Sequence, residues 1–268
     1  MLAIRLGASE IEYLRIAGRA PESPTVVMLH EGLGSVSMWR DFPTQLAQAT
    51  GSHVIAYSRH GYGKSAPLRG SREVRYMHDE ALVVLPQLLD ELGIDDPILF
   101  GHSDGGSIAL IHAGGSGRKV RGVVALAPHV FVEDVSVRSI AAAKVAYEST
   151  DLRERLARYH DDVDGVFWGW NDIWLHPEFR AWNIEEYLPR IQCPVLVIQG
   201  EDDEYGTNEQ LLRIERGAPS VELLTLEDCR HSPQKDQRDR VLQTVAQWMG
   251  ALPAITSAFR HLQEPPAP

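Results

Sequence analysis

The segment Pro97-Ile98-Leu99-Phe100-Gly101-His102-Ser103-Asp104-Gly105 decides the fold. Residues 97–101 form a short apolar run that predicts a strand, a helical pattern begins at Asp104, and the pattern Gly-x-Ser-x-Gly joins the two. Glycines suit such a strand-to-helix turn, because larger side chains would collide with the neighbouring strand and helix. The turn exposes the serine hydroxyl, so Ser103 is a candidate nucleophile. The alternative is a glycine-rich turn that holds a bystander serine.

The composition is that of a soluble globular protein. The chain has 268 residues, of which 44% are hydrophobic and 24% charged, and this length suits one large α/β domain. The net charge of −11 argues against nucleic acid and anionic membranes as partners, because both require a basic surface. The N-terminus shows no signal-peptide pattern, and no stretch approaches the ~18 apolar residues of a membrane helix. Cys193 and Cys229 are too few for a disulfide scaffold.

These features predict a cytoplasmic protein that acts on a small-molecule substrate. We expect neither a cofactor nor a metal ion. The sequence makes no prediction of the oligomeric state.

Short β-branched runs alternate with helical patterns along most of the chain, which predicts βαβ units and a mostly parallel sheet. The expected strands are residues 2–6, 11–16, 25–29, 53–57, 97–101, 120–126, 194–199 and 221–226. The first two are close enough in sequence to form an antiparallel hairpin at one edge of the sheet. The expected helices are residues 38–50, 72–92, 104–114, 207–216 and 234–250.

Residues 130–188 interrupt this alternation with nearly sixty positions that show no strand pattern. A structureless loop of that length is implausible in a compact domain, so the segment should contain helices, with helical patterns at 141–148 and 152–160. Four of the six tryptophans lie there, namely Trp168, Trp170, Trp174 and Trp182. We interpret 130–188 as a helical cap over the carboxyl edge of the sheet, inserted between strands six and seven of a core formed by 1–129 and 189–268.

A serine nucleophile needs a base and an acid that orients the base. His231 follows the last expected strand, so its loop lies at the same sheet edge as the turn around Ser103. The run Gly200-Glu201-Asp202-Asp203-Glu204 follows the seventh strand and reaches the same edge. Asp203 is the preferred acid and Asp202 the alternative. The order Ser, Asp, His along the chain is the order found in hydrolases with this turn.

The reaction also needs two donors to a developing oxyanion. The amide of Asp104 lies at a helix N-terminus, where partial positive charge favours an anion. The second donor is expected from the glycine-rich loop after the third strand, with Gly32 preferred and Leu33 as the alternative. Candidate residues of the substrate pocket are Glu31, Leu33, His102, Trp168, Trp170 and Trp174. For the tryptophans, the alternative is packing inside a small helical layer.

Five motifs together resemble those of the α/β-hydrolase superfamily over nearly the whole chain. They are LHEGLGSVSMWR at 29–40, SRHGYGKS at 58–65, GHSDGG at 101–106, QGEDDEYG at 199–206 and CRHSP at 229–233. In this superfamily the acid usually falls three residues after the glycine of its loop, which indicates Asp203. The oxyanion amide usually falls two residues after the histidine of its loop, which indicates Gly32.

The run Ser103-Asp104-Gly105-Gly106 is similar to that of the biphenyl-hydrolase-like esterases. The resemblance implies an α/β-hydrolase fold, with an eight-stranded, mostly parallel sheet flanked by helices and a helical cap. It implies cleavage of a small carboxylic ester, thioester or lactone through an acyl-enzyme on Ser103. Two positions depart from the family pattern: Glu31 stands where many relatives have glycine, and Asp104 stands where they often have an apolar residue. Two alternatives stay open: a carbon–carbon bond hydrolase of ring-cleavage products on the same triad, and a non-catalytic binding protein.

Overall fold

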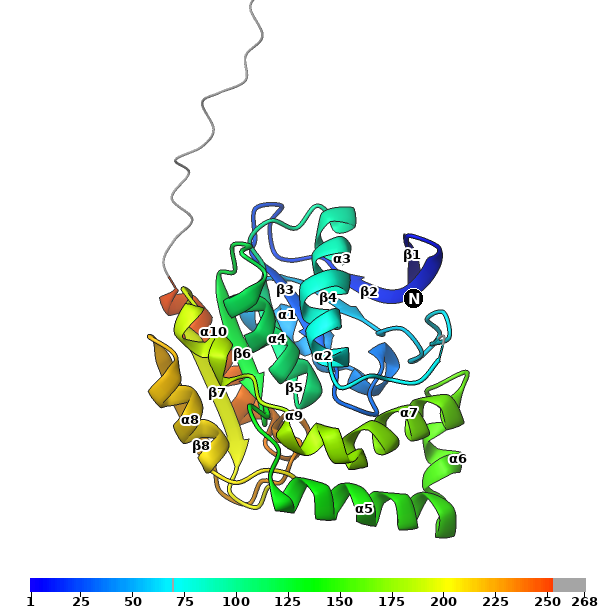
Figure 1. Cartoon of the computed structure of the whole chain (residues 1–268). Helices are drawn as coiled ribbons and strands as arrows, with labels where there is room; N and C mark the ends of the chain where they lie inside the picture. The colour runs from blue at the N-terminus through cyan, green and yellow to red at the C-terminus, as the bar shows by residue number, and fades with distance from the viewer. Residues whose placement is uncertain (69, 253–268) are drawn as a thin grey trace, which may run out of the picture.

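A single eight-stranded sheet forms the centre of the computed structural model, which describes residues 1–68 and 70–252 (Figure 1). The strand order is β1-β2-β4-β3-β5-β6-β7-β8. The strands are β1 Leu2–Leu6, β2 Ser9–Ile16, β3 Thr25–Leu29, β4 His53–Tyr57, β5 Ile98–His102, β6 Gly122–Leu126, β7 Val195–Gly200 and β8 Val221–Leu226. This confirms the predicted α/β-hydrolase fold and places all eight expected strands in one sheet.

The sheet is antiparallel at one edge and parallel elsewhere. Strand β2 pairs antiparallel with β1 and with β4, so the expected hairpin is present. The remaining neighbours pair in parallel from β4 to β8. The central strands β5, β6 and β7 are buried along their whole length, as expected where helices cover both faces of a parallel sheet.

Helices cover both faces of the sheet. They are η1 Val36–Trp39, α1 Phe42–Thr50, α2 Tyr76–Asp79, η2 Glu80–Val84, α3 Leu85–Leu92, α4 Asp104–Gly115, α8 Glu209–Gly217, α9 Pro233–Asp236 and α10 Arg238–Ala251. Buried residues of α1 and α10 pack with Val26 and Met28 of β3. Buried residues of α3, α4 and α8 belong to the core that contains Val27 and Leu29. The alternating residues of one strand therefore enter two separate cores, as the strand period of two requires.

Three expected helices are divided in the structure. The helix expected at 38–50 is broken at Arg40, whose φ is 55°, because α1 restarts with Pro43 in its first turn. Proline has no amide hydrogen, and its ring clashes with the carbonyl four residues earlier, here that of Trp39, so one continuous helix is disfavoured. The helix expected at 72–92 begins at Tyr76 and passes through the π-helical turn η2. The helix expected at 234–250 is divided into α9 and α10 at Gln237.

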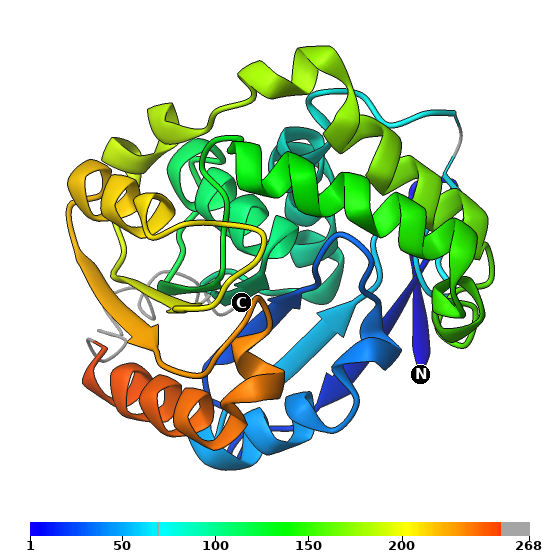
Figure 2. The same ribbon diagram turned by 90° about the horizontal axis from the view of Figure 1, so that it is seen from below.

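The segment between β6 and β7 is helical, as the sequence predicts. It contains α5 Asp134–Ser149, α6 Leu152–Leu156, α7 Val163–Leu175, η3 Pro177–Ala181 and η4 Glu185–Arg190. In Figure 2 the green α5 and yellow-green α7 lie side by side across the molecule, and in Figure 1 they lie beyond the end of β6. Helix α7, which carries three of the tryptophans, adds to the two helical patterns expected here. None of the helices in the described ranges is long and apolar enough to cross a membrane.

Candidate active site

Ser103 occupies a strained turn between β5 and α4. Its φ of 54° and ψ of −118° are unusual for a residue with a side chain. The flanking glycines make this turn possible, because the backbone comes very close to both. A Cβ added to Gly101 would lie 2.1 Å from the carbonyl oxygen of Gly105, and one added to Gly105 would lie 2.0 Å from that of Leu29.

A chain of hydrogen bonds joins the three residues of the expected triad. Nε2 of His231 is 2.9 Å from Oγ of Ser103, and its Nδ1 is 2.8 Å from Oδ1 of Asp203. Asp202 is exposed, and its amide bonds to the carbonyl of Cys229 at 3.0 Å. The geometry thus brings Asp203, and not Asp202, to the histidine.

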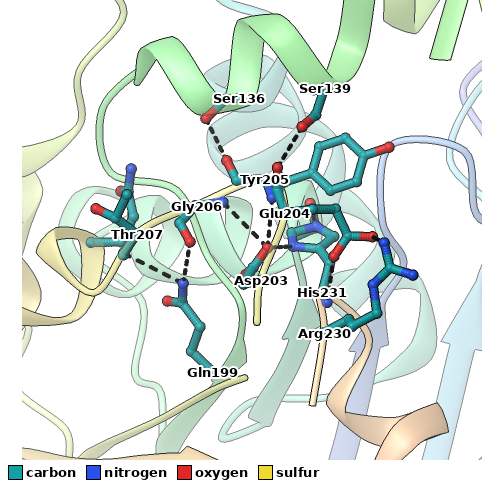
Figure 3. Close-up of polar contacts among 12 residues, drawn as sticks. Ser136, Ser139, Gln199, Asp203, Glu204, Tyr205, Gly206, Thr207, Arg230 and His231 are labelled. Atoms are coloured by element: carbon teal, nitrogen blue, oxygen red, sulfur yellow. Dashed lines mark hydrogen bonds and ion pairs between the residues drawn. The ribbon is translucent and has the colours of Figure 1, made fainter. Parts of the chain in front are cut away.

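The acid lies in a loop that stabilises its charge, as Figure 3 shows. Oδ1 of Asp203 also accepts hydrogen bonds from the amides of Tyr205 at 2.8 Å and Gly206 at 3.2 Å. Burial acts to raise the pKa of Asp203, but the nearby His231 and these hydrogen bonds outweigh it. The pKa therefore lies below its usual value. An ionised Asp203 fixes the Nδ1 hydrogen of His231 and leaves Nε2 free to accept a proton.

Helix α5 anchors the same loop (Figure 3). Oγ of Ser136 donates to the carbonyl of Tyr205 at 2.6 Å, and Oγ of Ser139 donates to the carbonyl of Glu204. The Glu204 carboxylate accepts a hydrogen bond of 3.2 Å from the amide of His231. The segment between β6 and β7 is thereby connected to both loops that carry the acid and the base. These contacts could not be predicted from the sequence, where their only signal is the position of Glu204 beside Asp203.

His102 supports the histidine loop from behind the nucleophile. Its Nε2 donates to the carbonyl of His231 at 2.7 Å, and its Nδ1 lies 3.0 Å from Nε2 of Gln234. Nδ1 is also 3.5 Å from a carboxylate oxygen of Glu31. His102 therefore links the loop after β3 to the loop after β8.

Three hydrogen bonds to the Glu31 carbonyl fix the orientation of the peptide between Glu31 and Gly32. The Glu31 carbonyl accepts hydrogen bonds from Nδ1 of His30 at 2.7 Å, Nη2 of Arg59 at 2.9 Å and the amide of Gly34 at 3.0 Å. In a trans peptide the N–H points opposite to the C=O. The N–H of Gly32 is therefore directed away from Arg59 and His30, an orientation that suits a donor to a ligand.

Both carboxylates near this loop are paired with other groups. Asp104 is buried, 3.8 Å from Nη2 of Arg59, and accepts a hydrogen bond of 2.7 Å from Tyr76. Glu31 lies 3.8 Å from Nζ of Lys235 as well as near His102. Burial acts to raise the pKa of Glu31, but the hydrogen-bond contact with His102 and the charge of Lys235 hold it well below its usual value.

A cavity of about 200 Å³ opens onto the nucleophile. It contains the predicted pocket residues Glu31, Leu33, His102, Trp170 and Trp174, and the predicted oxyanion donors Gly32 and Asp104. Six residues that were not predicted from the sequence complete its wall, namely Met38, His129, Ile140, Leu156, Tyr205 and Ser232. Ile140 and Leu156 come from α5 and α6, so their role depends on how the helical segment packs on the sheet.

The prediction for Trp168 is wrong. Trp168 lines a different cavity of about 660 Å³ with Arg72 and Glu73, and Nζ of Lys144 lies 5.5 Å from its ring centroid. Residues 170 and 174 are four apart and share one face of α7, whereas residue 168 lies about 200° around the helix from residue 170. A run of tryptophans on one helix does not reveal which of them face the catalytic cavity.

No group of three or more His, Cys, Asp or Glu side chains in residues 1–68 and 70–252 is arranged to hold a metal ion.

Two kinds of known enzyme are similar to this chain in sequence. The chain is 33% identical over 100 residues to a proline iminopeptidase of Lactobacillus delbrueckii subsp. lactis, a match that covers 37% of this chain and only 34% of that protein. It is 25% identical over 241 residues to the 2-hydroxy-6-oxononadienedioate/2-hydroxy-6-oxononatrienedioate hydrolase 2 of Pseudomonas putida, covering 78% and 82% of the two chains.

Among solved structures, the enol-lactonase from Burkholderia xenovorans LB400 superposes with a TM-score of 0.72 at 20% identity, over 93% of this chain and all of the other. A sequence profile described as the alpha/beta hydrolase family matches residues 26–244, the range that contains the serine turn, the acid loop and the histidine loop. The protein is a member of the alpha/beta hydrolase family.

Proposed function

We propose that the protein is a serine hydrolase that cleaves small carboxylic esters, thioesters or lactones through an acyl-enzyme on Ser103. The observation that carries the proposal is the hydrogen-bonded chain from Ser103 through His231 to Asp203 at the wall of the cavity. A serine hydroxyl becomes a nucleophile when an oriented base accepts its proton. The geometry supplies that base and a charged acid to orient it.

The steps follow from these positions. Nε2 of His231 takes the Ser103 proton while Oγ attacks the substrate carbonyl, and the resulting oxyanion accepts hydrogen bonds from the amides of Gly32 and Asp104. Collapse of this intermediate breaks the bond to the leaving group, which receives the proton from His231. Water then attacks the acyl-enzyme with the same assistance and releases the acid.

The cavity limits the size of the substrate. About 200 Å³ accommodates a small acyl or alcohol group near the serine. We infer that 130–188 acts as the cap of this pocket, because Ile140, Leu156, Trp170 and Trp174 contribute to its wall and α5 is bonded to the acid loop. A wall built from an inserted segment allows specificity to differ between proteins that share the same triad.

Carbon–carbon bond hydrolysis is the second candidate. The supporting observation is the 25% identity, over most of both chains, to a protein named as a hydrolase of 2-hydroxy-6-oxononadienedioate. A second protein of similar name, from Dechloromonas aromatica (strain RCB), is 26% identical over 255 residues. The same serine, histidine and aspartate would serve, but the leaving group would be a carbon atom.

A substrate panel tests the proposal. It contains 4-nitrophenyl acetate and butanoate, a thioester, a lactone, a 2-hydroxy-6-oxodienoate and prolyl 4-nitroanilide, with wild type and Ser103→Ala measured side by side. We expect turnover of esters by the wild type, its loss in Ser103→Ala, and labelling of Ser103 by a fluorophosphonate. Dienoate cleavage with negligible ester turnover would favour the second candidate. Absence of labelling and of all turnover would favour a non-catalytic binding protein.

A further inference from the structure

His129 is a third histidine in the wall of the catalytic cavity, beside His231 and His102. It follows β6, and its backbone is fixed by Ser107 of α4, whose Oγ accepts from the His129 amide at 3.1 Å and donates to the His129 carbonyl at 2.6 Å. The ring of Trp174 packs edge-on against its imidazole with a centroid distance of 5.2 Å. The imidazole therefore has a fixed place in the pocket.

This imidazole has no protein partner in the part of the chain that the structure describes. The side chain is only 3% exposed, and its Nδ1 is buried without a hydrogen bond. His231 is near, with ring centroids 5.8 Å apart, but its two nitrogens are already bonded to Asp203 and Ser103. Buried polar atoms are normally satisfied, and an unpaired one is destabilising. Because the ring lines the cavity, a ligand there can reach the edge of the imidazole that faces it.

The imidazole is neutral when the enzyme works. Burial lowers the pKa of His129 to about 3, and the neighbouring His231 adds to this effect while Asp203 opposes it. A neutral imidazole carries one N–H donor and one lone-pair acceptor. It suits an uncharged partner such as a hydroxyl or a carbonyl oxygen, and it offers no charge to an anion.

Much of the cavity wall is apolar. Leu33, Met38, Ile140 and Leu156 present aliphatic side chains to it. Such a wall binds a hydrocarbon group without regard to its polar substituents, whereas a buried hydrogen-bonding group rejects a ligand that leaves it unpaired. His129 is thus placed to distinguish a polar substrate from an apolar one of equal size.

We propose that His129 recognises an uncharged oxygen substituent of the substrate, a hydroxyl or a keto group close to the scissile carbonyl. The preferred substrates are then small hydroxylated or oxo-substituted esters rather than plain alkyl esters. This inference rests on the proposed ester hydrolysis. The same chemistry can reside on the acyl or on the alcohol side of the ester, and two matched substrate pairs distinguish these sources.

Each pair exchanges one hydroxyl for a methyl group. The acyl pair is 4-nitrophenyl 3-hydroxybutanoate and 4-nitrophenyl 3-methylbutanoate, and the alcohol pair is 2-hydroxypropyl butanoate and 2-methylpropyl butanoate. We expect wild type to favour the hydroxylated member of one pair by about tenfold or more in kcat/KM, since the alkyl member leaves His129 unpaired. In His129→Leu that ratio should fall to about one, and His129→Asn, which keeps a donor and an acceptor, should restore part of it.

His78 provides a matched control. It is also buried, with an unpartnered Nδ1, but it packs against Trp182 and Tyr187 and is not part of the cavity wall. His78→Leu removes a comparable side chain, and its selectivity ratio should equal that of wild type. A ratio near one in wild type for both pairs, or a ratio retained in His129→Leu, would overturn the inference.

A binding measurement separates this inference from the proposed reaction. Ser103→Ala cannot form the acyl-enzyme, so its Kd for the members of each pair, measured by tryptophan fluorescence, reports recognition alone. Preference for the hydroxylated ester in Ser103→Ala, without turnover by wild type, would support the subsite and overturn the ester hydrolase. Turnover by wild type with equal Kd values within both pairs would support the hydrolase and overturn the subsite.

Discussion

Nη2 of Arg59 donates a hydrogen bond of 2.9 Å to the backbone carbonyl of Glu31. That carbonyl belongs to the same peptide as the N–H of Gly32, and the same Nη2 lies 3.8 Å from the carboxylate of Asp104. One buried guanidinium thus contacts both residues that border the expected oxyanion site, on the loop after β3 and at the start of α4. Such a group acts through the donors rather than on the substrate, and we regard Arg59 as a positioning residue.

Replacing Arg59 with lysine tests this role. Lysine keeps a positive charge near Asp104 but presents one ammonium group instead of a planar fork, so the bond to the Glu31 carbonyl should be lost. We expect kcat to fall about tenfold with little change in KM, because misaligned donors weaken transition-state binding. Affinity for a boronic acid that mimics the tetrahedral intermediate should fall in parallel. An unchanged kcat in folded Arg59→Lys would contradict the assignment.

The triad predicts strongly non-additive losses. Ser103→Ala should reduce kcat by about 10⁴-fold or more, and combining it with His231→Ala should cost little further, since the residues act as a unit. Asp203→Asn should also be severe, because the wrong imidazole tautomer would face the serine. Asp202→Asn is the matched control, and its kcat should remain near that of wild type. Severe loss in Asp202→Asn with a mild effect in Asp203→Asn would reverse the choice of acid.

Gly105, at the start of α4, is required because the neighbouring backbone of β3 leaves no room for a side chain, and not because of helix propensity. Gly105→Ala would place a methyl group 2.0 Å from the Leu29 carbonyl, and we expect the free energy of unfolding to fall by about 2–4 kcal/mol. Gly250 of α10 has open space around it, so Gly250→Ala should stabilise the helix by about 0.5–1 kcal/mol. Urea denaturation of the two variants measures both values. Equal effects would show that helix propensity alone governs these positions.

The triad could be predicted because its members depend on local rules. Ser103, Asp203 and His231 each follow a strand, and the carboxyl ends of parallel strands meet at one edge of the sheet. The strands themselves are short apolar runs with clear ends. The distinction between Asp202 and Asp203 rested on the family spacing, and the structure separates them by which carboxylate reaches Nδ1 of His231.

The rest of the site depends on contacts between distant segments. His129 is one of eleven histidines, and its burial results from packing against Trp174, 45 positions away along the chain. The direction of Trp168 depends on which face of α7 lines the catalytic cavity. The sequence does not indicate this face, because α7 carries large apolar side chains around much of its circumference. Arg59 lies in a motif, but its two contacts are set by the loops after β3 and β5.

The lowered pKa of His129 has a consequence for stability in acid. The folded protein keeps this imidazole neutral down to about pH 3, whereas in the unfolded chain it takes a proton below its ordinary value of 6.5. Between these two values the unfolded state binds more protons, so the free energy of unfolding falls as the pH falls. One such group contributes about 1.4 kcal/mol per pH unit, or about 2 kcal/mol between pH 7 and pH 5. In His129→Leu this contribution is absent, so the free energy of unfolding should decline less steeply by that amount. Four other buried histidines also have lowered pKa values, and their contributions remain in the variant: His30, His78, His112 and His160. Chemical denaturation of wild type and variant at several pH values checks the difference in slope, and parallel curves would mean that His129 is not held neutral in the folded protein.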